Sequence, residues 1–214
     1  MPPKPPRRTR ERILETALAM FNELGEPTVA TTSIAIEMGI SPGNLYYHYR
    51  SKEAIVQDLF AQFRREIEAT LAAPESRLPN AEDCWLFLHL VFEAIWKYRF
   101  IYRDINDLVA RYRVIEVQFR RILAHKIRVA QQILGGLVKG GQMRAEPSEI
   151  ATLAENIVLV ASYWMSFENA RDPRAVQDGH TFARGAFHVI ALAAPYLEPR
   201  ERELFDQLAK RYIA

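Results

Sequence analysis

Hydrophobic residues recur at helical spacing along most of this chain. One face of the segment 10–24 is apolar, and it consists of Ile13, Leu14, Ala17, Leu18, Phe21 and Leu24. Gly25 directly follows this segment and is a natural C-terminal stop for a helix. A second helix is expected to begin at Thr31 or Thr32, whose hydroxyl can cap it, and to stop at Gly39. No segment shows the two-residue alternation of a strand, so the pattern predicts an all-α fold.

Two further helix starts follow this second helix. Ser41 is a favoured N-cap and Pro42 suits the first helical position, so a short third helix is expected to end near residues 47–48. Ser51 caps a fourth helix, which should run up to a loop at Pro74 to Pro79 that separates a small N-terminal unit from the rest. Breaker residues divide the remainder into helices expected at about 81–98, 101–111, 114–139, 147–167, 174–194 and 198–212. The whole chain should therefore contain about nine to ten helices.

The composition is that of a soluble globular protein. The 214 residues are 49% hydrophobic and 25% charged, and the net charge is only +2, so any nucleic-acid function must come from local charge placement. No apolar segment follows the basic N-terminus, and no run of about 18 apolar residues occurs, so neither a signal peptide nor a transmembrane helix is expected. The single cysteine, Cys84, lies beside Trp85 in an apolar helical pattern, which predicts a buried structural thiol rather than a redox sensor. A cytoplasmic protein without a membrane partner is expected.

The segment between Thr31 and Lys52 carries the functional signal. Two short helices meet at Gly39-Ile40-Ser41, a turn of the helix-turn-helix type. In the second of these helices only Leu45 is aliphatic, and it should anchor the helix to a core formed by Phe21, Ile34 and Met38. The other positions carry small, polar or aromatic groups, which allow close approach to the major groove and can read base edges.

The local charge supports the same interpretation. No Asp or Glu occurs from Met38 to Lys52, and the N-terminal segment carries the basic residues Lys4, Arg7, Arg8, Arg10 and Arg12 against the single acid Glu11. Phosphate contacts dominate affinity for DNA, so an acid-free surface next to a basic arm is the expected footprint. The alternative is that the segment belongs to an ordinary helical bundle, in which Tyr46, Tyr47 and Tyr49 are amphipathic core aromatics.

A family resemblance favours DNA binding. The sequence from Arg10 to Gly25 resembles the first helix of the TetR family of bacterial transcriptional regulators, and the sequence from Thr31 to Ala54 resembles that family's helix-turn-helix signature. The resemblance covers about residues 8 to 60 without a gap. It implies a basic flexible arm at 1–9, a DNA-binding domain at 10–56 and an effector-binding and dimerisation domain at 57–214.

The resemblance also implies roles for individual residues. Those that match the family's DNA-contacting positions are Thr31, Thr32, Ser33, Pro42, Gly43, Asn44, Tyr46, Tyr47, His48 and Lys52. Lys52, at the start of the fourth helix, matches a lysine that binds phosphate. Pro42 departs from the family pattern, because many members carry a polar or basic residue there, so one base contact is replaced by an apolar contact or lost. Tyr49 matches an aromatic residue that is packed inward.

The C-terminal part is rich in aromatic residues, and the family binds effectors in this region. The residues expected to line a ligand cavity are Trp85, His89, Phe92, Trp96, Phe100, Tyr102, Phe119, Tyr163 and Trp164. Such a lining would suit a small hydrophobic or acyl-type effector. The alternative is that these aromatics pack as a solid core. No cofactor is expected, and no metal site either, because the five histidines are dispersed.

Two segments, about 149–167 and 175–194, combine small and apolar residues and resemble the family's dimer interface. A two-fold dimer would place two recognition helices about one DNA turn apart, and so would bind a palindromic operator. The rival interpretation is a helical carrier of hydrophobic ligands, or an enzyme, without DNA binding. A carrier would leave the acid-free helix and the basic arm unexplained, and no phosphate loop or nucleophile elbow supports an enzyme.

Overall fold

The computed structural model describes residues 6–72, 78, 80–172 and 179–213. Within these ranges the chain forms eleven α-helices, one short 3₁₀ helix and no named strand. The helices are α1 (Pro6–Leu24), α2 (Thr31–Glu37), α3 (Pro42–His48), α4 (Lys52–Leu71), α5 (Ala81–Lys97), α6 (Arg99–Arg103), α7 (Ile105–Arg111), α8 (Arg113–Lys139), α9 (Pro147–Arg171), α10 (Gly179–Ala193), η2 (Ala194–Tyr196) and α11 (Pro199–Ile213). The all-α fold expected from the sequence is confirmed.

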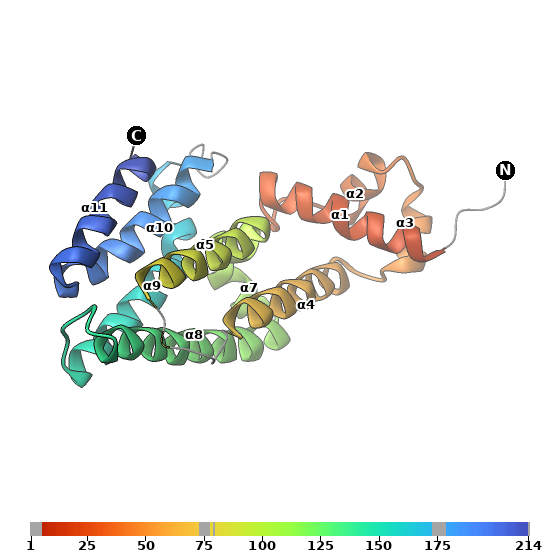
Figure 1. The fold of residues 1–214 in the computed structure, drawn as a ribbon. Coiled ribbons are helices and arrows are strands. Elements are labelled where there is room, and N and C mark those ends of the chain that lie inside the picture. The colour runs from red at the N-terminus through yellow and green to blue at the C-terminus, as the bar shows by residue number, and fades with distance from the viewer. Residues whose placement is uncertain (1–5, 73–77, 79, 173–178, 214) are drawn as a thin grey trace.

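The helices form two parts joined by α4. Figure 1 shows α1, α2 and α3 gathered at one end of the molecule, and α10 and α11 at the opposite end. The long helix α4 packs against α1 in the first part and against α5 and α8 in the second. The boundary expected between residues 56 and 57 therefore falls inside one continuous helix, so the two parts share a rigid element.

Local chemistry explains the starts of α3 and α4, whereas the cap expected from Thr31 or Thr32 is wrong, because α2 follows Ala30 and has no side-chain cap. The Ser41 hydroxyl accepts a hydrogen bond from the Asn44 backbone N–H at 3.2 Å, and the Ser51 hydroxyl accepts one from the Ala54 N–H at 3.2 Å. Both caps lie where the sequence predicted them. Gly39 has a φ of 65°, a left-handed conformation that glycine adopts without strain, and it reverses the chain between α2 and α3.

Several helix boundaries differ from the expectation, and α9, for example, runs to Arg171 instead of ending near residue 167. α1 begins at Pro6, so residues 6–9 of the expected flexible arm are helical, while residues 1–5 of that arm lie outside the described residues. The helix expected over 101–111 starts earlier, at Arg99, and is interrupted at Asp104, which gives two helices instead of one. The interruption has a tertiary cause, because the side chains of Arg103 and Asp104 bind the end of α1.

The largest core cluster runs continuously through both parts of the molecule. It includes Leu45 of α3, Phe63 of α4 and Phe119 of α8, all buried. The ring of Phe63 lies 5.7 Å from that of Tyr98 and 5.5 Å from that of Tyr102, centroid to centroid, in edge-on geometry. Motion of α4 relative to α5 and α6 would therefore disturb this aromatic packing.

The long helix α9 is apolar enough, by length and composition alone, to cross a membrane, and no other helix in the described ranges meets that test. Here α9 packs against α6, α8 and α10. Its outward face carries Leu159, Tyr163 and Phe167, which follow one another at four-residue spacing and are exposed. The apolar residues of α9 thus lie partly in the core and partly on an exposed face.

Candidate nucleic-acid interface and effector cavity

The helix α3 presents a polar and aromatic surface to solvent. Leu45 is completely buried in the core with Phe21 and Ile34, as the sequence predicted, and this anchor sets the orientation of the helix. The opposite positions, including Asn44, are exposed, and the Tyr47 side chain is 82% exposed. Side chains held by a buried anchor and left open to solvent have the arrangement that a groove-reading helix requires.

A hydrogen bond joins α3 to the start of α2. The hydroxyl groups of Tyr46 and Thr31 lie 2.9 Å apart, at the surface of the domain. Thr32 is exposed and Ser33 is half-buried in the same turn of α2. The residues that the resemblance assigned to phosphate contact on α2 thus lie beside those that it assigned to base contact on α3.

Two basic side chains have internal partners. The Lys52 ammonium donates to the backbone oxygens of Glu26 at 2.7 Å and of Val29 at 3.0 Å, and pairs with the Glu26 carboxylate at 3.1 Å. Since an ammonium has three protons, its donors are all used. Arg10 pairs with Asp58 at 2.7 Å and donates to the Tyr49 hydroxyl at 3.1 Å. In the free protein Lys52 thus has a structural role, and its contact with phosphate stays a prediction.

The buried Tyr49 confirms the inward packing that the resemblance implied. Its hydroxyl donates to Asp58 at 2.8 Å, and the Arg10 guanidinium lies over its ring at 5.1 Å. Burial raises the pKa of Tyr49 to about 12. Tyr49 therefore ties α1, α3 and α4 together as a neutral hydrogen-bonding group.

The carboxylate of Glu26 is the centre of the junction between the two parts. Glu26 is completely buried in the turn between α1 and α2. It accepts hydrogen bonds from the Tyr112 hydroxyl at 3.2 Å and from the Arg111 guanidinium, in addition to its pairing with Lys52. Its backbone N–H donates to Asp104 at 3.1 Å. One carboxylate thus connects the start of α4 with the end of α7, and the N-terminal part with the larger part.

A second set of contacts joins α1 to α5 and α6. The Asn22 side chain donates to the backbone oxygen of Lys97 at 2.9 Å and accepts from the Phe100 N–H at 3.0 Å, so it bridges the break between α5 and α6. The Arg103 guanidinium donates to the carbonyl oxygens of Phe21 at 2.6 Å and Asn22 at 3.1 Å. The carbonyl groups at the end of a helix have no partner within the helix. Arg103 supplies hydrogen bonds to two of them at the end of α1.

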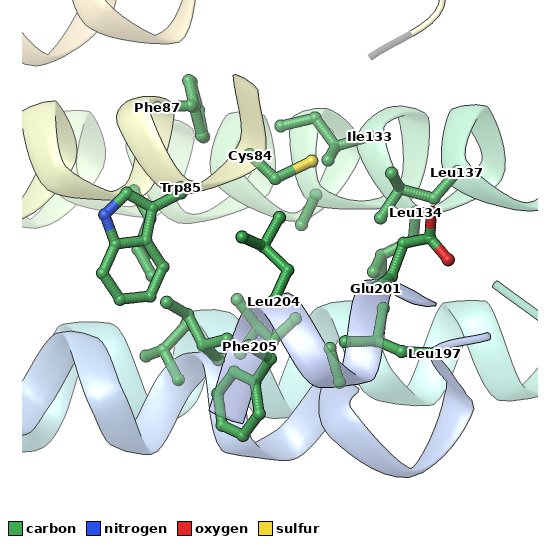
Figure 2. A pocket seen from close by; sticks show the side chains of 16 residues that line it. Cys84, Trp85, Phe87, Ile133, Leu134, Leu137, Leu197, Glu201, Leu204 and Phe205 are labelled. Carbon is green, nitrogen blue, oxygen red and sulfur yellow. The ribbon is translucent and has the colours of Figure 1, made fainter. Parts of the chain in front are cut away.

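The larger part contains an apolar cavity of about 140 Å³ between α5, α8, α9, α10 and α11. Figure 2 shows α5 and α8 on one side of it, with the side chains of α11 on the other. The lining residues are Cys84, Trp85, Phe87, Leu88, Ala130, Ile133, Leu134, Leu137, Ile157, Val189, Ile190, Ala193, Leu197, Glu201, Leu204 and Phe205. This volume is close to the roughly 150 Å³ of an engineered apolar cavity that holds one benzene molecule.

Most of the residues expected to line a cavity do not line this one. Trp85 lines the cavity. The eight expected residues that do not line it are His89, Phe92, Trp96, Phe100, Tyr102, Phe119, Tyr163 and Trp164. Phe92, Phe100, Tyr102 and Phe119 are buried in the core, which agrees with the alternative of solid aromatic packing. Trp164 is also buried, and its indole N–H donates to the Thr181 carbonyl at 2.9 Å.

The remaining three residues lie at the surface or close to it. His89 pairs with Glu93 at 3.3 Å, and both line a shallow surface depression with Trp96. Tyr163 lies on the exposed face of α9. Helical periodicity identified these faces as apolar, but it did not show which neighbour would cover each face.

Two buried groups lie next to the aromatic core. The Lys126 side chain on α8 is only 4% exposed, and its ammonium group donates to the Tyr102 hydroxyl at 2.9 Å. Burial lowers the pKa of Lys126 to about 7 and raises that of Tyr102. Lys126 is thus a buried amine whose hydrogen-bond partner is a neutral hydroxyl group.

Cys84 is half-buried in the cavity wall, so the expectation of a buried structural thiol is only partly met. Burial raises the pKa of the Cys84 thiol to about 12, with a smaller effect from Asp83, and a thiol that stays protonated reacts slowly. Among the residues that the structure describes, no group of three or more His, Cys, Asp or Glu side chains could hold a metal ion.

Part of the cavity wall comes from α11 and from small residues of α8 and α10, which no local motif marks. Leu204 and Phe205 lie on α11, and Ala130 and Ala193 make room opposite larger neighbours. The amphipathic pattern of residues 198–212 shows that α11 buries one face. It does not show that this face closes a cavity.

Comparisons with known proteins cover both parts of the chain. A family model described as bacterial regulatory proteins of the tetR family matches residues 13–59, and one described as a bacterial transcriptional repressor matches residues 62–205. A crystal structure of a TetR-family transcriptional regulator from Marinobacter aquaeolei VT8 has a TM-score of 0.84 and 31% sequence identity, and covers 95% of this chain and 98% of that chain.

Two curated relatives match mainly in the N-terminal part. UidR of Escherichia coli strain K12, an HTH-type transcriptional regulator, is 38% identical over 66 residues, which is 31% of this chain and 34% of UidR. KstR2 of Mycobacterium tuberculosis strain H37Rv, an HTH-type transcriptional repressor, is 39% identical over 77 residues, 32% of this chain and 38% of KstR2. These matches span little more than a third of either relative. Taken with the family model over residues 62–205, they show that the chain belongs to the TetR family of bacterial transcriptional regulators.

Proposed function

We propose that this TetR-family regulator is a repressor that binds a palindromic DNA operator as a dimer and is released by a small hydrophobic ligand. The observation that carries the DNA-binding role is the exposed, acid-free surface of α3, held in place by the buried Leu45. The predicted contacts come from Pro42, Gly43 and Asn44 at the start of α3 and from Tyr46, Tyr47 and His48 in its second half. Thr31, Thr32 and Ser33 of α2 contact the phosphate backbone.

The exposed face of α9 supports a dimer. Leu159 and Phe167 are 57% and 56% exposed, and Tyr163 lies between them on the same face. A contiguous apolar surface of this kind is commonly covered by a partner. The small residues expected at the interface have a different role, because Ala154, Ala161 and Ala186 are buried within the single chain. We therefore assign the dimer contact to the large residues of α9 rather than to its small ones.

The junction contacts support a route from the cavity to the DNA-binding part. α5 supplies Cys84, Trp85 and Phe87 to the cavity wall, and its last residue, Lys97, is held by Asn22 of α1. A ligand that displaces α5 would act on α1 through this bond, and on α4 through their shared packing. Such a ligand releases DNA only if it binds the released conformation more tightly, and a hundredfold difference corresponds to about 2.7 kcal/mol.

The DNA-binding proposal can be tested by fluorescence anisotropy with DNA from immediately upstream of the protein's own gene. Asn44→Ala and Tyr47→Ala should each weaken specific binding by about tenfold, because good base contacts contribute roughly 1–3 kcal/mol. Gln132→Ala, which removes an exposed amide on α8, is the matched control and should leave binding unchanged. Equal binding by all three variants and the unmodified protein would contradict the assignment of α3.

The dimer contact needs a separate measurement. Leu159→Glu together with Phe167→Glu should convert the protein to a monomer in sedimentation velocity and strongly reduce operator affinity. A monomeric unmodified protein at micromolar concentration would contradict the dimer. Ligand binding by a protein that binds no DNA would instead support the rival function of a carrier.

A further inference from the structure

The effector cavity contains one charged side chain among its sixteen lining residues, the carboxylate of Glu201. Figure 2 shows Glu201 at one end of the cavity, near Leu137 and Leu197, with Trp85 at the opposite end. In the ranges that the structure describes, Glu201 has no hydrogen-bond or ion-pair partner, whereas its neighbour Arg202 pairs with Asp206 at 3.2 Å. An otherwise apolar cavity thus ends at an unpaired carboxylate.

The position of Glu201 in α11 favours a negative charge. α11 begins at Pro199, and Glu201 lies in its first turn, where the free N–H groups and the helix dipole stabilise a carboxylate. This local effect accounts for an acid at the start of the helix, but not for its presence in the wall of an apolar cavity. Any ligand that fills the cavity meets this charge at one end.

We propose that the cavity binds a lipophilic organic cation, whose amine or amidinium group pairs with Glu201 while a single ring or a short branched chain fills the apolar part. The inference rests on the proposed function, in which this cavity is the effector site. A cation forms a charge-assisted hydrogen bond to the carboxylate, a neutral ligand gains only from apolar burial, and an anion is repelled. The cavity volume of about 140 Å³ limits the apolar group to roughly one ring.

The nearest buried basic group does not compensate for Glu201. Lys126 lies one helical turn before Ala130 on α8, but it is outside the cavity wall and its ammonium group donates to Tyr102. Its lowered pKa, about 7, also leaves it only about half protonated at neutral pH. A carboxylate or phosphate head group would therefore find no cationic partner in the wall. The acyl-type effector expected from the sequence is replaced by a cationic one.

The test compares three probes of nearly equal size: phenethylamine, phenethyl alcohol and phenylacetate. Binding to the full-length protein is measured by calorimetry, with quenching of tryptophan fluorescence as a second readout. We expect phenethylamine to bind at least about tenfold more tightly than phenylacetate, since a hydrogen bond to a charged group is worth roughly one such factor. Glu201→Gln should abolish this preference while leaving the affinity for phenethyl alcohol unchanged.

Glu203→Gln is the matched control, because Glu203 is exposed on the same helix and does not line the cavity. It should keep the preference for the amine. Ala193→Phe, which fills the cavity, should abolish binding of all three probes, with circular dichroism as the check on folding, and Ala130→Phe serves as a second blocking variant.

Four outcomes would overturn the proposal: equal or tighter binding of phenylacetate, an amine preference that survives Glu201→Gln, probe binding that survives both blocking variants, or no binding of phenethylamine at millimolar concentration. Release of DNA is scored separately by anisotropy. Amine binding that depends on Glu201 but never releases DNA would support the ligand class and contradict the proposed effector function. The two failures are therefore distinguishable.

Discussion

The helix-turn-helix surface and the apolar cavity differ in how their residues are placed. On α3, exposure follows the helical period, with Leu45 inward and Asn44 and Tyr47 outward. In the cavity, five helices meet, and apolar residues that look equivalent in the sequence have different positions. Phe92 fills the core, while Phe87, little more than one helical turn away on α5, lines the cavity. A surface site is thus described by one helix, whereas a cavity depends on how several helices pack.

The largest predicted effect concerns the junction at Glu26, which, like the cavity, depends on how several helices pack. Glu26→Ala removes the partner of Lys52 and Arg111 and should destabilise the protein by about 2–4 kcal/mol. This is less than a fully buried pair, because both cations reach solvent. Urea unfolding measures the loss, and Glu23→Ala, an exposed change on α1, is the control. A loss equal to that of Glu23→Ala would mean that the two parts are not held together by this carboxylate.

The close approach of α9 and α10 provides the next largest effect. A Cβ atom at Gly185 would lie 2.6 Å from Cδ1 of Trp164 and 2.7 Å from Cε1 of Phe92, so Gly185→Ala should destabilise the protein by about 1–3 kcal/mol. Gly135 on α8 has no neighbour within 4 Å of such an atom, and Gly135→Ala should be neutral or stabilising by about 0.5–1 kcal/mol. Thermal unfolding of the two variants gives the comparison. Equal melting temperatures would show that the helices separate easily.

The buried Lys126 predicts a dependence of stability on pH. Its folded pKa of about 7 is below its unfolded value of 10.5, so the unfolded chain binds more protons between these values. Stability should therefore rise with pH above about 7, by more than about 1 kcal/mol up to pH 9. Lys126→Met should remove this rise and stabilise the protein at pH 7 by about 1 kcal/mol or more. Lys139→Met, at an exposed site on α8, should change neither. A wild-type stability that is flat over this range would contradict a lowered Lys126 pKa.

The smallest effect concerns the basic residues near α3. Lys52 is held by Glu26, whereas Arg50 is exposed in the same acid-free segment. If Arg50 contacts phosphate, Arg50→Ala should reduce the slope of log affinity against log salt by about 0.9, and Lys52→Ala should leave that slope unchanged while lowering stability. Anisotropy titrations at several salt concentrations measure both slopes. A reduced slope for Lys52→Ala would show that Lys52 leaves Glu26 to bind DNA, as the family resemblance implied.

Several features could be predicted because they depend on neighbouring residues alone. The caps at Ser41 and Ser51, the stop at Gly39 and the inward direction of Leu45 all follow from local chemistry and helical period. The division of α6 from α7 could not be predicted this way. Its cause is the binding of Arg103 to α1, about 80 residues earlier in the chain.

The cavity residues could not be predicted from local sequence patterns either. Trp85 was identified because aromatic residues are often found in ligand sites, but the same reasoning selected Phe100 and Tyr102, which are core residues. Glu201 carried no signal, since an acid in the first turn of a helix is common. Its importance depends on α11 packing across α5 and α8.

The sequence by itself determined the helical class, the start and end of most helices and the face that α3 shows to solvent. These depend on side chains within a few residues of one another, for which the helical period is sufficient information. Only the tertiary structure decided which apolar faces became core and which left a cavity. It also decided that Lys52 and Arg111 share one buried carboxylate. The reason is physical: burial and charge pairing depend on distances between helices, and no local pattern contains those distances.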